Sequence, residues 1–379
     1  MDKARENAAT DCYVVGYPLM LSHVASRGDV MRNEVRFLAH PDAELEHSVG
    51  MNGRVMTAIA WMDLRREPIV IALPRSNRYY TASLFDAWTQ LIAPLGTRIT
   101  GDASCRVAVI GPGCDTRAIP PELSCIEAST NLVGLLVRVA AVREPELHSV
   151  ATFLHEIDVV PLREFLYGRR TTAVEGSAPT QRHVVAAVEA MSGSEFFAEL
   201  AVLHPELAWP KCGADRAAVD EGVELAQHRI QSYDEPRTRS DDWWIDGASQ
   251  ASSPLHFLRR AAVARKRLHA ELQFDYLRLV SDRDAYGRPL EGGVRYGLRI
   301  ERHDEPPARG PWSIGAWPLR TQVWPSVMAV DEPGARMFHL SSDDEPFHIV
   351  LHAFWPEDRL LSGGWVPPKI ERLVDKSGA

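Results

Sequence analysis

Two tyrosines, an aspartate and a tryptophan lie close together in the segment RYYTASLFDAW, and an arginine follows ten residues later. Side chains alternate between the two faces of a strand, so we expect Tyr80, Asp86 and Trp88 on one face and Tyr79 on the other. A carboxylate buried in an apolar strand must be hydrogen-bonded or paired, and Arg98 is the expected partner of Asp86. Two interpretations stay open. Asp86 and Arg98 form a structural ion pair, or Asp86 is an acid–base group that Arg98 orients and a tyrosine assists.

The second half of the chain offers histidines and tryptophans. His348 and His352 would share a face of a strand or a helix, which suits metal ligation. No carboxylate-bearing histidine motif accompanies them, so a packed or hydrogen-bonded pair is favoured and no metal is predicted. Trp312 belongs to a tryptophan-rich region that either fills a sandwich core or presents a stacking surface for a flat ligand. The chain has no GxGxxG opening a helix, no phosphate loop and no GxSxG elbow, and no cofactor is predicted.

The bulk properties narrow the class of protein. At 379 residues the chain is long for one hydrophobic core, so two domains are expected. The net charge of −9 argues against a nucleic-acid partner. The charged start MDKARENAAT lacks the apolar run of a signal peptide, and no run approaches the length of a membrane span. The cysteines show no paired spacing, so we expect a cytoplasmic protein without disulfides that does not bind membranes.

Short β-favouring runs that alternate with Gly, Pro and Asn occupy residues 49–142, as in an antiparallel sandwich. A helix is expected over residues 10–26, helical spacing fills most of residues 145–235, and another helix covers residues 254–273. A second β-rich block begins at residue 276. The prediction is a mixed α and β protein with two antiparallel, jelly-roll-like β-sandwich domains and a helical region between them. Its segments are residues 1–145 (helix plus sandwich), 146–253 (helical) and 254–379 (helix plus sandwich).

The string RYYTASLFDAWTQLIAPLGTRITG resembles the central signature of the family named domain of unknown function 1254. Later motifs resemble its usual carboxy-terminal partner, domain of unknown function 1214. They are Arg260-Ala261, DAYGRPLEGGVRY, Pro306-Pro307, Trp312-Ser313 and the segment WVPP from Trp365. The matches are spread in order over residues 13–370. The resemblance implies two β-sandwich domains with a helical region between them, and it implies no established reaction.

The chain departs from the family pattern before its first long β run. The family's Asn-x-Asp-Thr is Asn52-Gly53-Arg54-Val55 here, so a guanidinium replaces a carboxylate. A guanidinium fork suits carboxylate or phosphate recognition, which makes Asn52 and Arg54 candidates for substrate binding. The alternative is an exposed loop arginine. Near the end, Gly364 stands where the family has Asn.

We therefore expect a cofactor-independent enzyme that acts on a small organic metabolite, with anionic metabolites among the candidates and specialised metabolism as a candidate setting. Its chemistry would be proton transfer: hydrolysis, elimination, isomerisation or cyclisation. Asp86 would be the acid or base, Tyr79 or Tyr80 the hydrogen-bond donor, and Arg54 or Arg98 the anion anchor. The alternatives are a non-catalytic binding protein for a carbohydrate or apolar metabolite, and a metal-dependent cupin-like enzyme. A homodimer is also open.

Overall fold

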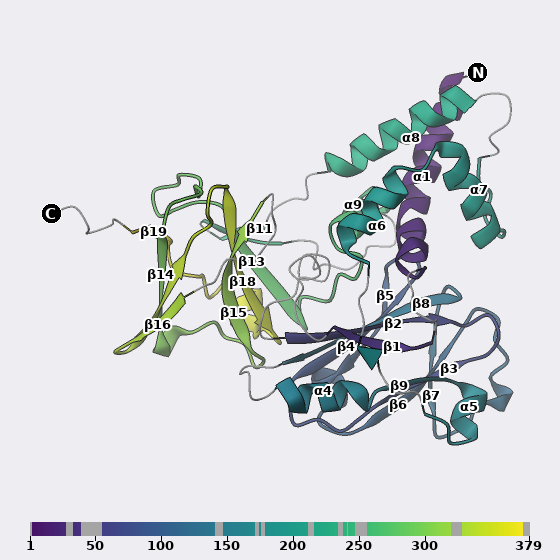
Figure 1. The fold of residues 1–379 in the computed structure, drawn as a ribbon, viewed down its shortest axis with the longest axis horizontal. Coiled ribbons are helices and arrows are strands. Elements are labelled where there is room, and N and C mark those ends of the chain that lie inside the picture. The colour runs from purple at the N-terminus through teal and green to yellow at the C-terminus, as the bar shows by residue number, and fades with distance from the viewer. Residues whose placement is uncertain are drawn as a thin grey trace. The chain divides into compact units, whose positions relative to one another are not determined.

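The structure is a computed structural model, and it describes residues 2–27, 33–38, 55–140, 147–170, 174–175, 179–210, 216–233, 238–240, 242–246, 256–319 and 328–373. The candidates Asn52 and Arg54 lie outside the described residues. The chain divides into two compact units (Figure 1). Unit 1 comprises Met1–Pro41, Leu45–Glu235 and Ala251–Ala270, and unit 2 comprises Asp42–Glu44, Pro236–Gln250 and Glu271–Ala379. The described helices between residues 147 and 231 and the helix before residue 270 thus belong to unit 1.

Unit 1 contains a β-sandwich. One sheet has the order β10-β1-β2-β8-β4-β5, formed by Val174–Glu175, Val35–Leu38, Val55–Asp63, Leu132–Ala140, Tyr80–Asp86 and Leu91–Gly96. The other has the order β7-β6-β3-β9, formed by Ser124–Glu127, Cys105–Ile110, Ile69–Leu73 and Asp158–Pro161. β1 pairs with β10 and β6 with β7 in parallel, and the other pairings in these two sheets are antiparallel.

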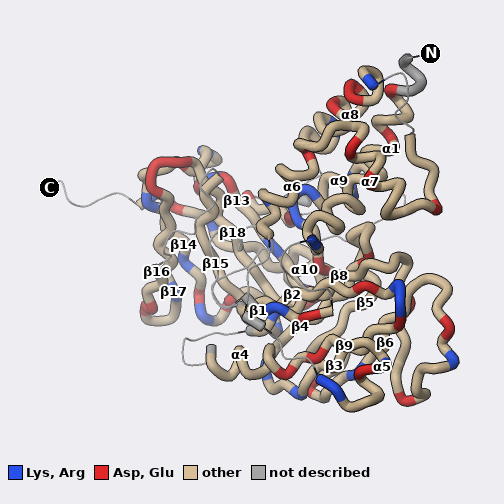
Figure 2. The backbone as a smooth tube through the Cα atoms, turned by 45° about the vertical axis from the view of Figure 1, so that its right-hand side comes forward, with Lys and Arg blue, Asp and Glu red and all other residues tan. Residues whose placement is uncertain are grey.

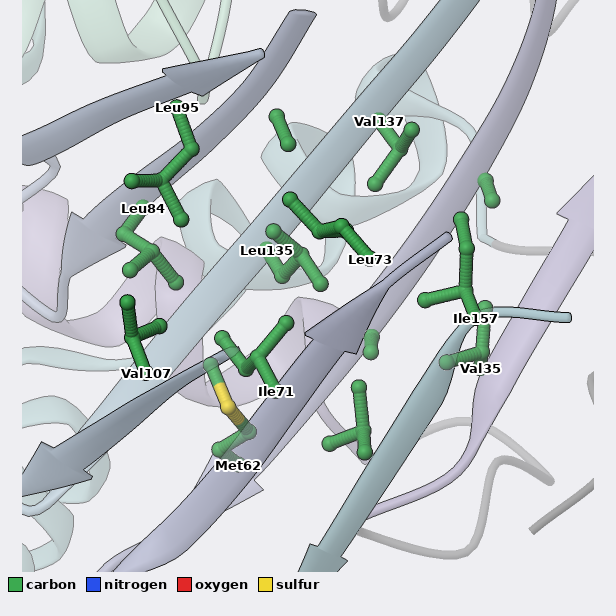
Figure 3. Close-up of a cluster of buried hydrophobic side chains, with 14 of the residues drawn as sticks. Val35, Met62, Ile71, Leu73, Leu84, Leu95, Val107, Leu135, Val137 and Ile157 are labelled. Atoms are coloured by element: carbon green, nitrogen blue, oxygen red, sulfur yellow. The ribbon is translucent and has the colours of Figure 1, made fainter. Parts of the chain in front are cut away.

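The sandwich core forms where alternate side chains of the two sheets meet. Ile71, Leu73 and Val107 come from the smaller sheet, and Leu84 and Leu135 come from the larger one (Figure 3). Every residue of β4 is buried, so both faces of the larger sheet are covered at this strand. One face of each strand enters this apolar layer. Apolar residues therefore alternate along the β-rich runs, and that alternation predicted the strands.

Helices form a second layer of unit 1. They are α1 (Asp2–Ala25), α6 (Gln181–Glu189), α7 (Gly193–Leu203), α8 (Arg216–Gln231) and α9 (Phe257–Lys266), and their apolar faces share one core. A polar network also links them. The Tyr17 hydroxyl donates to Glu189 Oε1 at 2.9 Å, and Arg265 Nε donates to the same oxygen at 2.8 Å. The predicted helices in these regions are confirmed. Among the described residues, no helix is long and apolar enough to cross a membrane.

Two local predictions are wrong. Helical spacing was expected throughout residues 145–166, but β9 separates α4 (Leu147–His155) from α5 (Leu162–Leu166). The β-branched pair Val159 and Val160 followed by Pro161 favours extended backbone over helix. The β-favouring texture of residues 49–142 predicts a strand at the run TRITG, but Thr97–Thr100 form one helical turn, α3. Glycines with φ of 109° and 65°, Gly96 and Gly101, bracket that turn.

Unit 2 is a second pair of sheets, and all of its strand pairings among the described residues are antiparallel. One sheet has the order β11-β12-β13-β18-β15, formed by Thr238–Ser240, Trp243–Ile245, Tyr276–Ser281, Phe347–Phe354 and Trp312–Pro318. The other has the order β16-β17-β14-β19, formed by Met328–Glu332, Ala335–Leu340, Tyr296–Glu301 and Glu371–Arg372. Trp243 and Trp365 are buried in the core of this unit, and Trp312 packs against it. Figure 2 shows basic and acidic residues interspersed along both units.

Candidate functional site

A cleft of about 530 Å³ lies in unit 1, at the ends of several strands and two helices. Strands β2 and β8 contribute Asp63 and Leu132, and helix α1 contributes His23. The full lining is His23, Asp63, Arg65, Trp88, Pro112, Ser129, Thr130, Asn131, Leu132, Val202, Leu203, His204, Glu206 and Leu207. Apolar and polar groups therefore face the same space, as in sites for small organic ligands.

Two histidines and a glutamate form a hydrogen-bonded chain in the cleft wall. His23 lies in the last turn of α1, and His204 caps the end of α7. Their Nε2 atoms are 3.2 Å apart, and His204 Nδ1 lies 3.0 Å from Glu206 Oε1. Both rings are buried, whereas the Glu206 side chain is 64% exposed. A carboxylate that accepts from one nitrogen of an imidazole orients the ring and stabilises its protonated form.

The contact between the two Nε2 atoms requires one donor and one acceptor. When His204 donates to Glu206 through Nδ1–H, its Nε2 is free to accept from Nε2–H of His23. When His204 gains a proton, it becomes the donor to His23 instead. The pair can therefore hold a proton at either ring, which is the property that a general acid–base group needs.

Asp86 ends β4 and is 1% exposed. The Gln90 backbone N–H donates to Asp86 Oδ1 at 2.9 Å, and the Ser129 hydroxyl donates to Asp86 Oδ2. Burial raises the pKa of the Asp86 carboxyl, while the bonds from Ser129 and Gln90 and the charge of Arg260 lower it by less. Because Ser129 lines the cleft, the buried carboxyl reaches the cleft through that hydroxyl. The prediction that a buried Asp86 is hydrogen-bonded is confirmed.

The predicted pairing of Asp86 with Arg98 is wrong. β4 and β5 pair Thr81 with Gly96 and Phe85 with Leu91, so Arg98 follows β5 beside the start of β4. Asp86 ends β4, about 17 Å away along the strand. The positive charge near Asp86 comes instead from Arg260 of α9. With its oxygen turned toward the guanidinium, the Gln90 side-chain amide accepts from Arg260 Nη1 at 3.0 Å.

Tyr79 and Tyr80 also lie at the start of β4, away from Asp86. Tyr80 is fully buried in the sandwich core, and its ring centroid lies 5.0 Å from that of Phe153. Its hydroxyl oxygen is 3.3 Å from Thr100 Oγ1, and burial raises its pKa. Tyr79 precedes the strand and is half-buried. These positions give Tyr80 a packing role in unit 1.

Replacing Tyr80 by phenylalanine is expected to lower the free energy of unfolding by about 1 kcal/mol or less, because only the long bond to Thr100 is lost. Denaturant unfolding of the two proteins measures the difference. Turnover should be unchanged. A variant of normal stability with strongly reduced turnover would instead show that Tyr80 takes part in the reaction.

Trp88 is the other predicted site residue that reaches the cleft. Its ring centroid is 6.4 Å from that of His204. It lies in the tight turn between β4 and β5, where Thr89 has a φ of 64° and its N–H donates to the Asp86 carbonyl at 2.9 Å. A β-branched residue with a positive φ has a strained backbone, and backbone strain of this kind is common at functional sites. Among the described predicted residues of unit 1, only Trp88 lines the cleft, and Asp86 reaches it through the Ser129 hydroxyl.

The raised pKa of Asp86 predicts a pH dependence of stability. A carboxyl with a higher pKa in the folded chain binds its proton more tightly when folded, so it favours folding at acid pH. That contribution is lost as the pH rises from the ordinary value of 3.8 through the raised value. Asp86→Asn cannot titrate, so it should gain stability relative to the wild type over this interval. Unfolding free energies of both proteins, measured from pH 4 to 8, give the stability of Asp86→Asn relative to the wild type. If this difference falls as the pH rises, the charge of Arg260 outweighs the effect of burial on the pKa of Asp86.

In unit 2, His348 and His352 share the outer face of β18, as the spacing predicts. His352 Nδ1 is 2.5 Å from the Tyr276 hydroxyl, and His348 meets the Trp244 ring edge-on at 5.8 Å between centroids. Both histidines are therefore packed or hydrogen-bonded. The described residues contain no group of three or more His, Cys, Asp or Glu that could hold a metal ion. Trp312, also in unit 2, makes an edge contact with Phe338, with centroids 5.9 Å apart.

Sequence reasoning missed His23, His204, Glu206 and Ser129. Helical spacing over residues 145–235 predicts a helix at His204-Pro205-Glu206, although a proline disfavours helical backbone at the residue before it and so marks a helix end. That ending places the imidazole at a helix terminus with a carboxylate two residues on. His23 carries no comparable signal, because its partner is 181 positions away.

Comparisons with known proteins bear on the fold. The crystal structure of the VPA0106 protein from Vibrio parahaemolyticus is similar over 98% of this chain and 100% of that chain, with a TM-score of 0.64 and 15% identity. An uncharacterized protein from Burkholderia cenocepacia has a TM-score of 0.41 and 10% identity, with 94% of this chain and 86% of that chain covered. No curated protein matches the sequence significantly. Residues 32–161, which include β4 with Asp86 and Trp88, match the family model described as protein of unknown function (DUF1254).

Proposed function

We propose that the chain is an enzyme that moves protons on a small organic molecule bound in the cleft of unit 1. The observation that carries this proposal is the hydrogen-bonded chain from His23 through His204 to Glu206 at the cleft wall. An imidazole with a carboxylate behind it is the usual arrangement for taking a proton from a substrate, and here His204 Nε2 must exchange its contact with His23 for one with the substrate. Nothing in this role requires a cofactor.

The second proton-handling group is Asp86 with Ser129. Its pKa is raised by burial, so its carboxyl holds a proton more readily than an exposed one. When protonated, Asp86 can donate to the Ser129 oxygen, and the Ser129 hydroxyl can then donate to a ligand in the cleft. When ionised, it accepts from Ser129, whose lone pairs then face the ligand. A base at His204 and an acid at Asp86 would suit proton abstraction from carbon, the first step of isomerisation, elimination and many cyclisations.

The cleft wall also favours a particular ligand shape. Trp88 offers a flat face beside His204, and Leu132, Leu203 and Leu207 supply apolar surface. A small compound with a flat or apolar body and a polar group fits such a lining. A non-catalytic binding protein would use the same wall, and the experiment must separate the two.

Proton abstraction from carbon can be detected without knowing the product. Purified protein would be incubated in D₂O with keto acids, β-hydroxy acids and lactones, and loss of C–H signals would be followed by NMR against enzyme-free samples. Exchange that disappears in His204→Gln supports the proposal. If a compound stabilises the protein thermally but no compound of the panel shows exchange or turnover, the protein binds without catalysis and the proposed enzymatic function is wrong.

We also propose that unit 2 is the partner domain of unknown function 1214 and that the protein works in the cytoplasm. The motifs at Trp312-Ser313 and Trp365 support the first part, since Trp365 is buried in the core of unit 2 and Trp312 packs against it. Replacing these tryptophans should therefore lower the stability of unit 2 more than it lowers any activity.

A further inference from the structure

Helix α9 places a charged side chain against the turn that joins β4 to β5. Arg260 belongs to α9 and is 8% exposed. With the oxygen of the Gln90 side chain turned toward it, the guanidinium donates to that oxygen from Nη1 at 3.0 Å and also from Nη2. Its Nε is buried without a hydrogen-bond partner among the described residues. Burying a guanidinium against a neutral amide costs free energy that an apolar residue would not cost, so packing alone does not account for Arg260.

Gln90 connects Arg260 to Asp86. The Gln90 backbone N–H donates to Asp86 Oδ1 at 2.9 Å, while its side-chain oxygen accepts from Arg260. The other carboxylate oxygen of Asp86 accepts from the Ser129 hydroxyl, which lies in the cleft wall. Of the groups that act on Asp86 among the described residues, only Arg260 is charged, and its charge lowers the pKa of the carboxyl against the larger effect of burial. Arg260 thus acts on Asp86 both through a hydrogen-bonded residue and through its charge.

The same contact holds the turn that carries Trp88 into the cleft. The turn begins at Ala87, whose N–H donates to Thr130 Oγ1 at 2.9 Å. It ends at Gln90, which accepts from Arg260. Trp88 lies between these two residues, and both Trp88 and Thr130 line the cleft. The turn is therefore fixed at one end by a residue of the cleft wall and at the other end by α9.

We propose that Arg260 is a positioning residue for the reaction in the cleft, because it holds Asp86 and Trp88 in place through Gln90. Arg260 is not among the residues that line the cleft, so it acts through the groups that it holds. This rests on the proposed function, in which Asp86 passes a proton to the ligand through a hydroxyl. Burial alone favours the protonated carboxyl, and the charge of Arg260 keeps the ionised form within reach, so that the proton can be released as well as held.

Titration of Asp86 tests this role without any substrate. In full-length protein with ¹³C-labelled aspartate carboxyls, the Asp86 signal is the one that is missing in Asp86→Asn. Arg260→Met removes the charge and keeps an unbranched side chain, so the pKa of Asp86 should rise further. Arg260→Lys keeps the charge and should leave that pKa near its wild-type value. Arg265→Met removes an arginine of the same helix that bonds to Glu189 instead, and it should leave the Asp86 titration unchanged.

Proton exchange separates positioning from packing. For a compound of the panel that exchanges with the wild type, Arg260→Met should lower the rate by about 10²-fold, as a small misplacement of a reacting group does. Because Asp86 acts in its protonated form, its raised pKa should also move the decline in rate to higher pH. Arg260→Lys should lose less, since an ammonium can still donate to Gln90, and its decline should stay at the wild-type pH. Arg265→Met should keep both the rate and the profile.

Gln90→Leu provides a variant at a partly exposed turn that leaves α9 unchanged. It keeps the backbone bond to Asp86 and removes the acceptor of Arg260, so it should reproduce much of the loss of exchange seen in Arg260→Met. An unmoved Asp86 titration in Arg260→Met overturns the proposal, and so does wild-type exchange in both Arg260→Met and Gln90→Leu. If the titration moves but no compound exchanges with the wild type, the action of Arg260 on Asp86 is supported and only the proposed reaction is wrong.

Discussion

His204→Gln is expected to reduce proton exchange by about 10²–10⁴-fold, the range that a positioned general acid–base group contributes. Glutamine keeps one donor and one acceptor near the positions of the ring nitrogens, so contacts with His23 and Glu206 can partly persist. It cannot gain or lose a proton near neutral pH. The loss should therefore appear in turnover, while the free energy of unfolding changes by about 1 kcal/mol. Exchange rates and denaturant unfolding of the same preparation measure both quantities.

Matched variants separate the chain of groups from a general effect of losing a histidine. His228→Gln, at an exposed position of α8, should leave the exchange rate unchanged. Glu206→Gln should lower the rate by less than His204→Gln, because the carboxylate only orients and stabilises the imidazole. Equal activity of His204→Gln and wild type would exclude His204 as the base and leave Asp86 with Ser129 as the remaining candidate.

Gly96→Ala is expected to lower the free energy of unfolding by more than about 3 kcal/mol. Gly96 has a φ of 109°, a conformation that side chains rarely adopt. A Cβ there would also lie 2.4 Å from the Tyr80 carbonyl oxygen and 2.9 Å from the Thr81 Cα, and both are backbone atoms that cannot swing away. Denaturant unfolding measures the loss.

Gly101 provides the matched control at the other end of the same helical turn. Its φ of 65° is left-handed, but no atom lies within 4 Å of the position that a Cβ would take. Gly101→Ala should therefore cost only the backbone strain, about 1–3 kcal/mol. Losses of equal size at the two glycines would show that the contact with Tyr80 is relieved by a shift of the hairpin.

The strands were predictable where one face of each enters an apolar layer. β2, β3, β4, β6 and β8 follow runs that the sequence marks by alternation and turn residues. β9 was not, because four residues between two helices carry too short a pattern to compete with the helical spacing around them. The same limit applies to α3, whose single turn depends on two glycine conformations that residue type alone does not reveal.

The candidate site was only partly predictable, for a different reason. Asp86 was identifiable as a polar residue inside an apolar strand, and it is buried and hydrogen-bonded. Its nearby charge, Arg260, comes from a helix far along the chain, and local spacing carries no information about that distance. Arg98 was close in sequence but lies at the wrong end of the strand, since a hairpin places residues by register.

The contact between His23 and His204 also constrains how the protein is made. The two residues are 181 positions apart, so α1 leaves the ribosome long before α7. At ordinary rates of synthesis the interval is roughly 10–40 s. For most of it, until α6 begins at Gln181, the apolar residues of α1 that pack on α6, α7, α8 and α9 have no native partners from those helices. The first helix of unit 1 must therefore wait for the last, and a chaperone that shields α1 in this interval would raise the yield of folded protein.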